Sequence, residues 1–404
     1  MMRRVGFLVL GVLLAGVVFA DYIYEKWRDK WDQLNITEKA IVRNMKTCET
    51  GTWTLKEKAV TELGLREKEQ LARVRPPLYE DMVKVMRAML VFDRWRVRRA
   101  AAEAVANIGC TQAIDLLKKM MFEDKKREVR AEAALAVARL SKKGDKEIIK
   151  MLCKALLEDG WSIVRASAAK GLRLVGDASA FEALYKAAES DSYSTVREQA
   201  LRTLFTLGCR TEQFRKIVAG RLDDAYSRVR AAACEIAGEI GLKAVADKVA
   251  QLLNDKKYRV RIAAAKALTK IAGPNQVQAV GDALKNSDVG EFRARLIEVL
   301  GKIATEDAKK VVAEAINDKD KFVRMAAMLT LCKLGDDRGI NALKKLLEES
   351  KSLYFFQMLH RIKTEKINHP KVIAMLEGLL KEMGKDDWRR GDLERVIKEL
   401  KGGK

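Results

Sequence analysis

The chain has 404 residues and carries 78 Lys and Arg against 56 Asp and Glu, which gives a formal net charge of +22. Its 48% apolar fraction is that of an ordinary soluble chain, and it excludes general disorder, collagen and a multi-span membrane protein. Only four residues are proline, so the composition allows few helix breaks and favours a helical chain.

Residues 1–20 have the pattern of a secretory signal peptide. Arg3 and Arg4 form a basic start, residues 5–20 are apolar and uncharged, and residues 18–20 form a small-x-small cleavage site before Asp21. We therefore expect an exported protein, either periplasmic or secreted. An uncleaved N-terminal anchor is the alternative, although a span needs roughly twenty apolar residues. Contact with a membrane would then be confined to residues 1–20.

Residues 21–75 do not share the repeat that follows them. We predict an N-terminal helical cap in this region, with one long helix over residues 55–74 that ends before Pro76 and Pro77. The clustered side chains of Trp27, Trp31 and Trp53 leave a second interpretation open. In that interpretation the segment is a separate docking or oligomerisation element.

One motif recurs along the rest of the chain: an apolar residue, an arginine and then an alanine-rich stretch. Its arginines are spaced by 31 to 35 residues. An amphipathic stretch with the helical period, such as residues 146–157, precedes each motif, and glycines such as Gly109 and Gly176 follow it. Each repeat is thus predicted to hold two helices and a short turn. The motif arginines are Arg98, Arg130, Arg165, Arg197, Arg230, Arg261, Arg293 and Arg324.

The pattern D-x(4)-V-R-x(2)-A-A-x-A-L-x(2)-I-G resembles the HEAT repeat in its short bacterial form, first associated with phycobilin lyases. The resemblance covers roughly residues 76–383. It implies an all-α fold, a right-handed α-solenoid (an ARM/HEAT-like superhelix) of about eight or nine helix pairs. We expect the repeat array over residues 76–350 and a degenerate last repeat with a C-terminal cap over residues 351–404. The final helices are predicted at 371–382 and 392–400.

An aspartate precedes each motif arginine by five or six residues. We expect it at the start of the second helix of its repeat, where a carboxylate can accept from unpaired backbone N–H groups. The resemblance implies that each arginine reaches the aspartate of the neighbouring repeat, which would form a structural ladder. Recurrence in every repeat suits a structural device, because a catalytic site is made once. The aspartates are Asp93, Asp124, Asp159, Asp191, Asp224, Asp255, Asp288 and Asp318.

The position five residues after each motif arginine is predicted to face a groove that binds a partner. Mixed charge with apolar members suits a protein or peptide, whereas a phosphate backbone requires a continuous positive track. Basic runs at residues 94–99, 125–127 and 256–259 suggest an edge for an acidic partner. The predicted groove residues are Glu103, Leu135, Lys170, Arg202, Glu235, Lys266, Glu298 and Leu329. Aromatic residues near the turns, which either anchor a partner or pack the turns, are Trp95, Trp161, Tyr193, Tyr226 and Tyr258.

The sequence contains no recognisable catalytic, cofactor-binding or metal-binding set. Its two histidines, His360 and His369, have no Cys-x-x-Cys beside them, and the sequence has no P-loop, G-x-S-x-G or G-x-G-x-x-G motif. The six cysteines have no paired spacing, so we expect them to be free. Free thiols do not fit easily with export to an oxidising compartment.

These observations predict a non-enzymatic, exported scaffold that binds a protein partner in its groove. One alternative is a binder of polyanions, such as nucleic acid or an acidic polymer, although export argues against nucleic acid. Another alternative is a cofactor-attachment lyase or chaperone like the phycobilin lyases. A match to a repeat transfers no site from those proteins, so this activity has little support in the sequence.

Overall fold

The computed structural model describes residues 25–402, except residues 67, 350 and 351. Within this part of the chain every element is a helix, which confirms the predicted all-α solenoid. No helix among these residues has the length and apolar character needed to cross a membrane. The predicted signal peptide, residues 1–20, lies outside the described residues. The chain divides into two compact units, residues 1–217 and 218–404, and each is described by itself.

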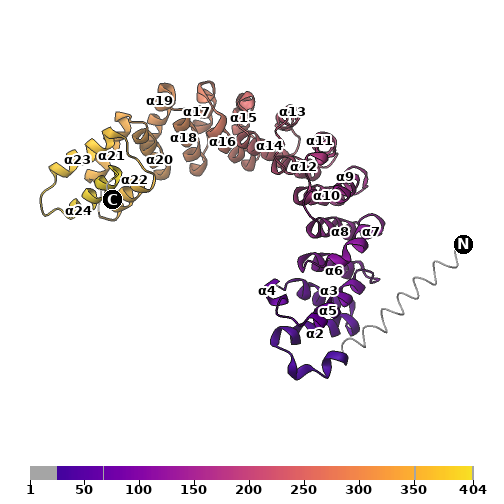
Figure 1. The fold of residues 1–404 in the computed structure, drawn as a ribbon. Helices are drawn as coiled ribbons and strands as arrows, with labels where there is room; N and C mark the ends of the chain where they lie inside the picture. The colour runs from indigo at the N-terminus through magenta and orange to yellow at the C-terminus, as the bar shows by residue number, and fades with distance from the viewer. Residues whose placement is uncertain (1–24, 67, 350–351, 403–404) are drawn as a thin grey trace. The chain divides into compact units, whose positions relative to one another are not determined.

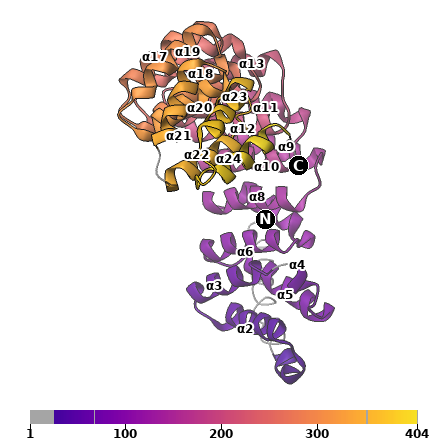
Figure 2. The same ribbon diagram turned by 90° about the vertical axis from the view of Figure 1, so that its left-hand side faces the viewer.

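The first unit stacks helix pairs, in which we call the first helix A and the second helix B. The B helices pack side by side: α3 contacts α6, α6 contacts α8, α8 contacts α10, and α10 contacts α12 (Figures 1 and 2). The pairs are α2 (Ile36–Thr50) with α3 (Trp53–Gly64), α5 (Pro76–Met89) with α6 (Trp95–Asn107), α7 (Ile114–Glu123) with α8 (Arg127–Leu140), α9 (Lys146–Glu158) with α10 (Ser162–Val175), and α11 (Phe181–Ser190) with α12 (Ser194–Thr206). Helix α13 (Glu212–Arg221) spans the boundary between the units.

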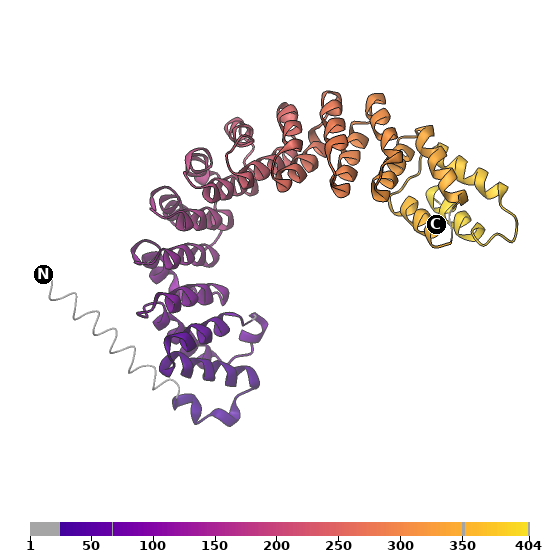
Figure 3. The same ribbon diagram turned by 180° about the vertical axis from the view of Figure 1, so that it is seen from behind.

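The second unit continues with the same kind of helix pair. Its B helices α14, α16, α18 and α20 again pack in sequence (Figure 3). The elements are α14 (Ser227–Glu239), α15 (Ala246–Gln251), η5 (Leu252–Asn254), α16 (Tyr258–Ile271), α17 (Val277–Asn286), α18 (Gly290–Ile303), α19 (Glu306–Glu314), η7 (Ala315–Asn317), α20 (Lys321–Lys333), α21 (Asp337–Glu349), α22 (Ser352–Thr364), α23 (Pro370–Glu382) and α24 (Arg390–Leu400). The final two helices lie where the sequence predicted them.

Small residues allow the B helices to approach one another closely. Ala264 and Ala265 of α16 are fully buried, as are the alanines at the matching positions of α6, α8 and α10. Gly64 of α3 lies against α6, and a Cβ added to it would stand 2.6 Å from the Cα of Ala104. Bulkier residues at these positions would force the helices apart, because close-packed interiors leave no spare volume.

The predicted helix over residues 55–74 is wrong. Helix α3 ends at Gly64, and a separate short helix, α4 (Lys68–Leu71), follows. Glycine is a poor helix former, and an unbroken helix of this length would run on for about 30 Å. The break instead allows Leu71 and Val74 to be buried.

The segment predicted as an N-terminal cap contains one helix pair of the repeat type. Helix α2 packs on α5 and α3 packs on α6, which is how the helices of neighbouring repeats pack elsewhere in this unit. The sequence signal is faint because the motif arginine is replaced by lysine. Trp53, Leu55 and Lys56 stand where Trp95, Val97 and Arg98 stand in the next repeat.

The C-terminal helices enclose their own apolar core. Phe355, Met358 and Ile362 of α22 are fully buried and belong to one cluster with residues from α20, α21, α23 and α24. The cluster also includes Leu329 of α20. This core is formed without the arginine motif, and the degenerate last repeat over residues 351–404 stays a prediction.

Candidate functional site

Motif arginines form bidentate ion pairs with an aspartate of the next repeat, and we call these the ladder pairs. In the first, Arg98 donates from Nε and Nη2 to the two carboxylate oxygens of Asp124, at 2.7 and 2.9 Å. Only 16% and 6% of these two side chains are exposed, so solvent screens the pair weakly. Further ladder pairs are Arg130–Asp159, Arg165–Asp191, Arg230–Asp255 and Arg293–Asp318, with Nε to oxygen distances of 2.7 to 2.9 Å.

Each ladder arginine also contacts the turn of its own repeat. Arg130 donates from Nη1 to the backbone carbonyl of Asp124 at 2.8 Å, while its Nε and Nη2 reach Asp159. One guanidinium thus joins two consecutive turns. Arg197 and Arg324 make the matching contact with their own turns, to the carbonyl oxygens of Asp191 and Asp318 at 2.6 and 2.8 Å.

The aspartates stand at the end of helix A, which corrects the expected position at the start of helix B. Asp124 is the C-cap residue of α7, and Asp159 is the C-cap residue of α9. The carboxylate of Asp124 accepts from the backbone N–H of Lys126 at 2.9 Å, within the turn and before helix α8 begins. Asp224 accepts in the same way from the N–H of Tyr226 at 2.9 Å. The aspartate therefore orders the turn and does not cap the second helix.

Two of the predicted ladder aspartates occupy a different position. Asp93 and Asp288 precede their arginines by five residues, whereas the paired aspartates precede theirs by six. The Asp93 side chain is 66% exposed, and its carboxylate lies 3.7 Å from Arg94 Nε. The Asp288 side chain is 95% exposed, and its carboxylate accepts from Lys319 Nζ at 2.9 Å. The place of the ladder aspartate falls to Phe92 and Ser287, neither of which has a carboxylate.

Lys56 does in the first helix pair what the motif arginine does in the others. Its Nζ donates to the backbone carbonyl of Glu49 at 2.6 Å and to that of Cys48, at the end of helix α2. The residue is 8% exposed, and its burial lowers the pKa of the ammonium. A lysine can supply these hydrogen bonds but lacks the fork that grips a carboxylate at two points.

Hydrogen bonding lowers the pKa of two ladder carboxyls, those of Asp255 and Asp318, despite their burial. Burial alone would raise the pKa of Asp318, but hydrogen bonds from Arg293 and from the Asp320 N–H outweigh it and hold the pKa below its usual value. The pKa of Asp255 is lowered for the same reasons, with Arg230 and the Lys257 N–H as donors. These groups hold structure together and present no proton at neutral pH.

Most of the predicted groove residues lie on the surface of the B helices. Lys170, Glu235, Lys266 and Glu298 are exposed, and Glu103, Leu135 and Arg202 are half-buried. Leu329 is an exception, because only 1% of it is exposed and it packs in the C-terminal core. The expectation that Leu329 faces a partner is therefore wrong, since helices after α20 cover this position.

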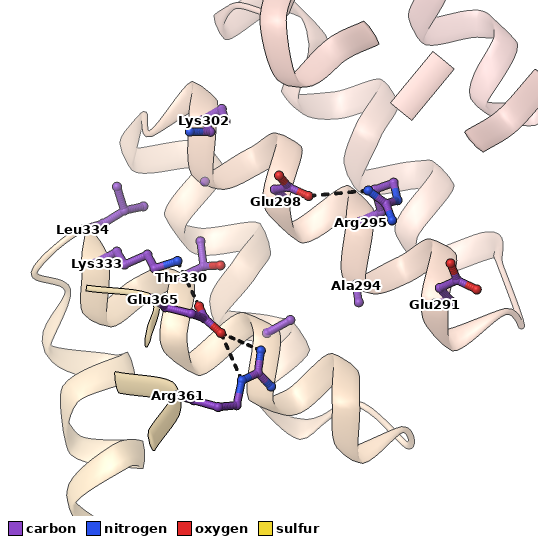
Figure 4. Close-up of a pocket in the computed structure, with 12 residues that line it drawn as sticks. Glu291, Ala294, Arg295, Glu298, Lys302, Thr330, Lys333, Leu334, Arg361 and Glu365 are labelled. Carbon is purple, nitrogen blue, oxygen red and sulfur yellow. Dashed lines mark hydrogen bonds and ion pairs between the residues drawn. The ribbon is translucent and has the colours of Figure 1, made fainter. Parts of the chain in front are cut away.

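The B helices of the second unit enclose a surface cavity of about 660 Å³ (Figure 4). It lies between α18, α20 and α22 and contains the predicted groove residue Glu298. Helices α18 and α20 approach closely beside it, because a Cβ on Gly301 would stand 2.5 Å from the Thr330 side chain. The lining residues are Glu291, Ala294, Arg295, Glu298, Gly301, Lys302, Ala326, Thr330, Lys333, Leu334, Arg361 and Glu365.

Charges of both signs line this cavity. Glu365 accepts from Lys333 at 2.9 Å and from Arg361 at 2.6 Å, and these bonds outweigh its burial and lower its pKa. Arg295 and Glu298 lie side by side on α18, with Nη1 and the carboxylate 3.9 Å apart (Figure 4). Such a distance is beyond a hydrogen bond, so both groups keep capacity for charges of a partner.

Exposed aromatic residues mark the turns between helices A and B. Trp161 is 51% exposed and Tyr193 is 54% exposed. The guanidinium of Arg127 lies 4.0 Å from the ring centre of Trp161, so an arginine of one repeat covers the tryptophan of the next. Tyr226 and Tyr258 are also exposed, whereas Trp95 is half-buried.

Among the described residues, no three His, Cys, Asp or Glu side chains gather to hold a metal ion. His369 is the N-cap residue of α23, where its Nδ1 accepts from the Lys371 N–H at 3.3 Å, and His360 is exposed on α22. The six cysteines are free, and five of them are buried. Burial raises the pKa of Cys48, Cys234 and Cys332 to about 12.

A model of HEAT repeats matches four stretches that together cover more than half of the chain: residues 49–138, 121–204, 215–295 and 277–354. The match begins at residue 49 and so includes α3, ahead of the region in which the sequence motif is evident. No curated protein sequence matches the chain.

Solved structures of similar fold include importin beta in an ammonium sulfate condition. It has a TM-score of 0.61 and 12% identity, over 92% of this chain and 58% of that one. The Kap95:Nup1 complex has a TM-score of 0.58 and 13% identity, over 93% and 59%. A structure of Kap95p bound to RanGDP has a TM-score of 0.56 and 12% identity, over 93% and 58%. The chain spans less than two thirds of those chains, and the likeness is one of fold alone.

Proposed function

Because the chain belongs to the HEAT-repeat family, we propose that it is a non-enzymatic scaffold that binds a protein partner on its B-helix face. The observation that carries this proposal is the cavity of mixed charge between α18, α20 and α22. A concave surface with a few placed polar groups is the usual form of a binding site.

The charge pattern of the face favours a protein over a polyanion. In the second unit Glu235 lies on α14, Lys266 on α16, and both Glu298 and Lys302 on α18, and all four are exposed. A phosphate backbone would meet acidic residues at every second helix, and like charges in contact are unfavourable. A protein surface with both signs can match such a pattern.

The fold provides a precedent for the mode of binding. Solved structures with this fold carry protein partners, as the names of the Kap95:Nup1 complex and of Kap95p with RanGDP state. Ran and Nup1 are partners of Kap95. What they support here is that a stack of helix pairs offers a protein an extended surface.

We further propose that the protein acts outside the cytoplasm after removal of residues 1–20. The sequence pattern of the signal peptide supports export. Burial of the cysteines removes the difficulty that free thiols raised, since a buried thiol with a raised pKa is slow to form the reactive thiolate. N-terminal sequencing of the mature protein tests cleavage, and a chain that begins at Met1 would refute it.

Charge reversal in the cavity tests the binding proposal. The double variant Glu298→Lys, Lys302→Glu should lose bound partners that the unchanged chain retains, as identified by mass spectrometry after affinity purification from the native compartment. A matched control, Lys345→Glu, reverses a charge that is 74% exposed on helix A of a repeat. If the cavity variant and the control retain the same partners in the same amounts, the cavity is not the binding site.

A further inference from the structure

Arg261 is a motif arginine whose repeat neighbour supplies no carboxylate. Its Nη1 donates to the carbonyl of Asp255 at 3.0 Å, the contact with its own turn that every ladder arginine makes. In the ladder pairs on either side, Arg230 and Arg293 use Nε and Nη2 to hold Asp255 and Asp318. Among the described residues, no carboxylate accepts from Nε or Nη2 of Arg261.

Ser287 takes the place of the missing ladder aspartate. Its hydroxyl accepts from the Val289 N–H at 3.2 Å, as Asp318 accepts from the Asp320 N–H at 2.8 Å. Its carbonyl oxygen accepts from Nη1 of Arg293 at 2.8 Å, the usual contact of the motif arginine with its own turn. The turn therefore has the shape of the other turns, while its side chain is shorter and uncharged.

The neighbouring acid does not replace this aspartate. The Asp288 side chain is 95% exposed and pairs with Lys319, on the side of the following repeat. Arg261 instead lies against two aromatic rings, with its guanidinium carbon 5.2 Å from the ring centre of Tyr258 and 5.8 Å from that of Phe292. A ring attracts a guanidinium without accepting its N–H donors as a carboxylate does, so the aromatic contacts do not replace the missing acceptor.

The surroundings of Arg261 attract anions. Lys256, Lys257 and Arg259 are exposed in the same turn, and Tyr258 is 39% exposed. The acidic residue of this turn, Asp255, is already paired with Arg230, and its side chain is only 6% exposed. The accessible charge at the start of α16 is therefore positive. It adds long-range attraction of anions to the short-range hydrogen bonds that the Arg261 guanidinium can donate.

We propose that Arg261, beside Tyr258 and Phe292 and opposite Ser287, binds a side-chain carboxylate from an acidic segment of a protein partner. The partner's carboxylate would take the position that Asp255 and Asp318 take in the ladder pairs on either side. In the neighbouring pairs the guanidinium donates to both oxygens of a planar carboxylate, so a partner's carboxylate could be held in the same way. This inference rests on the proposed function, because it states the charge of the bound protein. Its site is Arg261 and the turn before α16, not the cavity between α18, α20 and α22.

The test uses the full chain and a fluorescein-labelled peptide of ten residues in which Glu alternates with Gly, with a Gln–Gly peptide as the neutral control. By fluorescence anisotropy in about 0.15 M salt, the Glu peptide should bind about tenfold or more tightly than the Gln peptide. Arg261→Gln should remove this preference. Arg261→Lys should lose most of it as well, because a lysine keeps the charge but has no fork.

Two substitutions at Ser287 separate binding from folding. Ser287→Asp supplies the carboxylate from within the chain, so it should raise the melting temperature and abolish binding of the Glu peptide. Ser287→Asn, of similar size and uncharged, should leave binding within about twofold. If Arg261→Gln does not fold, these two variants still carry the test.

Several results would overturn the proposal. One is a Ser287→Asp variant with an unchanged melting temperature or unchanged peptide affinity. A second is a loss of Glu-peptide affinity in Lys257→Gln that is as large as the loss in Arg261→Gln, since this would assign binding to the general positive charge of the turn. Displacement of the peptide by micromolar inorganic phosphate would indicate a site for free anions. If the double variant Glu298→Lys, Lys302→Glu keeps all partners while the unchanged chain binds the Glu peptide through Arg261, the proposed binding at the cavity would be refuted and the site at Arg261 would stand.

Discussion

Gly238 of α14 touches Ala267 of α16 so closely that a Cβ on Gly238 would stand 2.7 Å from the Cα of Ala267. Backbone cannot move aside as a flexible side chain can, so the approach of these two B helices depends on the absence of one methyl group. The same device joins α3 to α6 through Gly64 and Ala104. Repeat stacking in each unit thus relies on particular small residues as well as on alanine in general.

Gly238→Ala should destabilise the protein by about 1–3 kcal/mol, because the added methyl overpacks the contact with α16. The matched control is Gly220→Ala on α13, where an added Cβ meets nothing within 4 Å. Alanine is the better helix former, so the control should gain about 0.5–1 kcal/mol. Thermal unfolding checks both, and two shifts of the same sign would contradict the assignment of Gly238 to a close contact.

Removal of one member of a ladder pair should destabilise the protein more than removal of both. Arg293→Ala leaves the Asp318 carboxylate buried without its partner, at a cost of about 3–5 kcal/mol. The double variant Arg293→Ala, Asp318→Ala should recover part of this loss. Lys310 and Asp307 form an exposed pair, 67% and 77% exposed, and provide the control cycle. There the coupling should stay below about 1 kcal/mol, and equal couplings in the two cycles would contradict the ladder's role.

Stability should fall as the solution is acidified, because the pKa values of Asp255 and Asp318 are lowered in the folded state. A carboxyl whose pKa is lowered on folding contributes its full stability at pH values above its pKa in the unfolded chain, about 3.9. This contribution is lost as the pH falls through the pKa of the folded state. Asp318→Asn imitates the protonated side chain. Its melting temperature should lie well below that of the unchanged chain at pH 6 and approach it below pH 4. A constant difference would show that the charge of Asp318 is not what stabilises the turn.

Lys56 should behave as a motif residue of the first helix pair. Lys56→Met removes the donor to the Cys48 and Glu49 carbonyls and should cost about 1.5–3 kcal/mol. Lys56→Arg should retain stability, since arginine fills this position in the following repeats. Lys58→Met, at a side chain 75% exposed, is the control and should change little. If Lys56→Arg were as unstable as Lys56→Met, Lys56 would not play the role of a motif arginine in this helix pair.

Much of the fold could be predicted because the helical period and the arginine motif repeat together. The final helices, α23 and α24, lie within two residues of their predicted bounds. The first helix pair was missed because Lys56 replaces the motif arginine and Trp53–Leu55 alone is a weak signal. The end of helix α3 at Gly64 was also missed, although glycine is a poor helix former and the break allows Leu71 and Val74 to be buried.

The spacing of the aspartates contained more information than the prediction used. A distance of six residues places the aspartate at the C-cap of helix A, whereas a distance of five, at Asp93 and Asp288, places it one residue too late in the turn. The burial of Leu329, by contrast, could not be predicted from the spacing of the motif. Its position in the motif matches that of exposed residues such as Lys266, and only the packing of the degenerate last repeat covers it.

Each ladder arginine bonds both the turn of its own repeat and the aspartate of the next, so a whole repeat can be inserted or deleted without breaking these contacts. If residues 127–161 were excised, Asp124 would precede Arg165 by six residues, so Arg165 would find a carbonyl on its own side and Asp191 on the other. Arg98 would keep Asp124. Loss of a single helix would instead strand a buried charge. Duplication or deletion of whole repeats can thus change the length of such a chain without breaking any remaining pair.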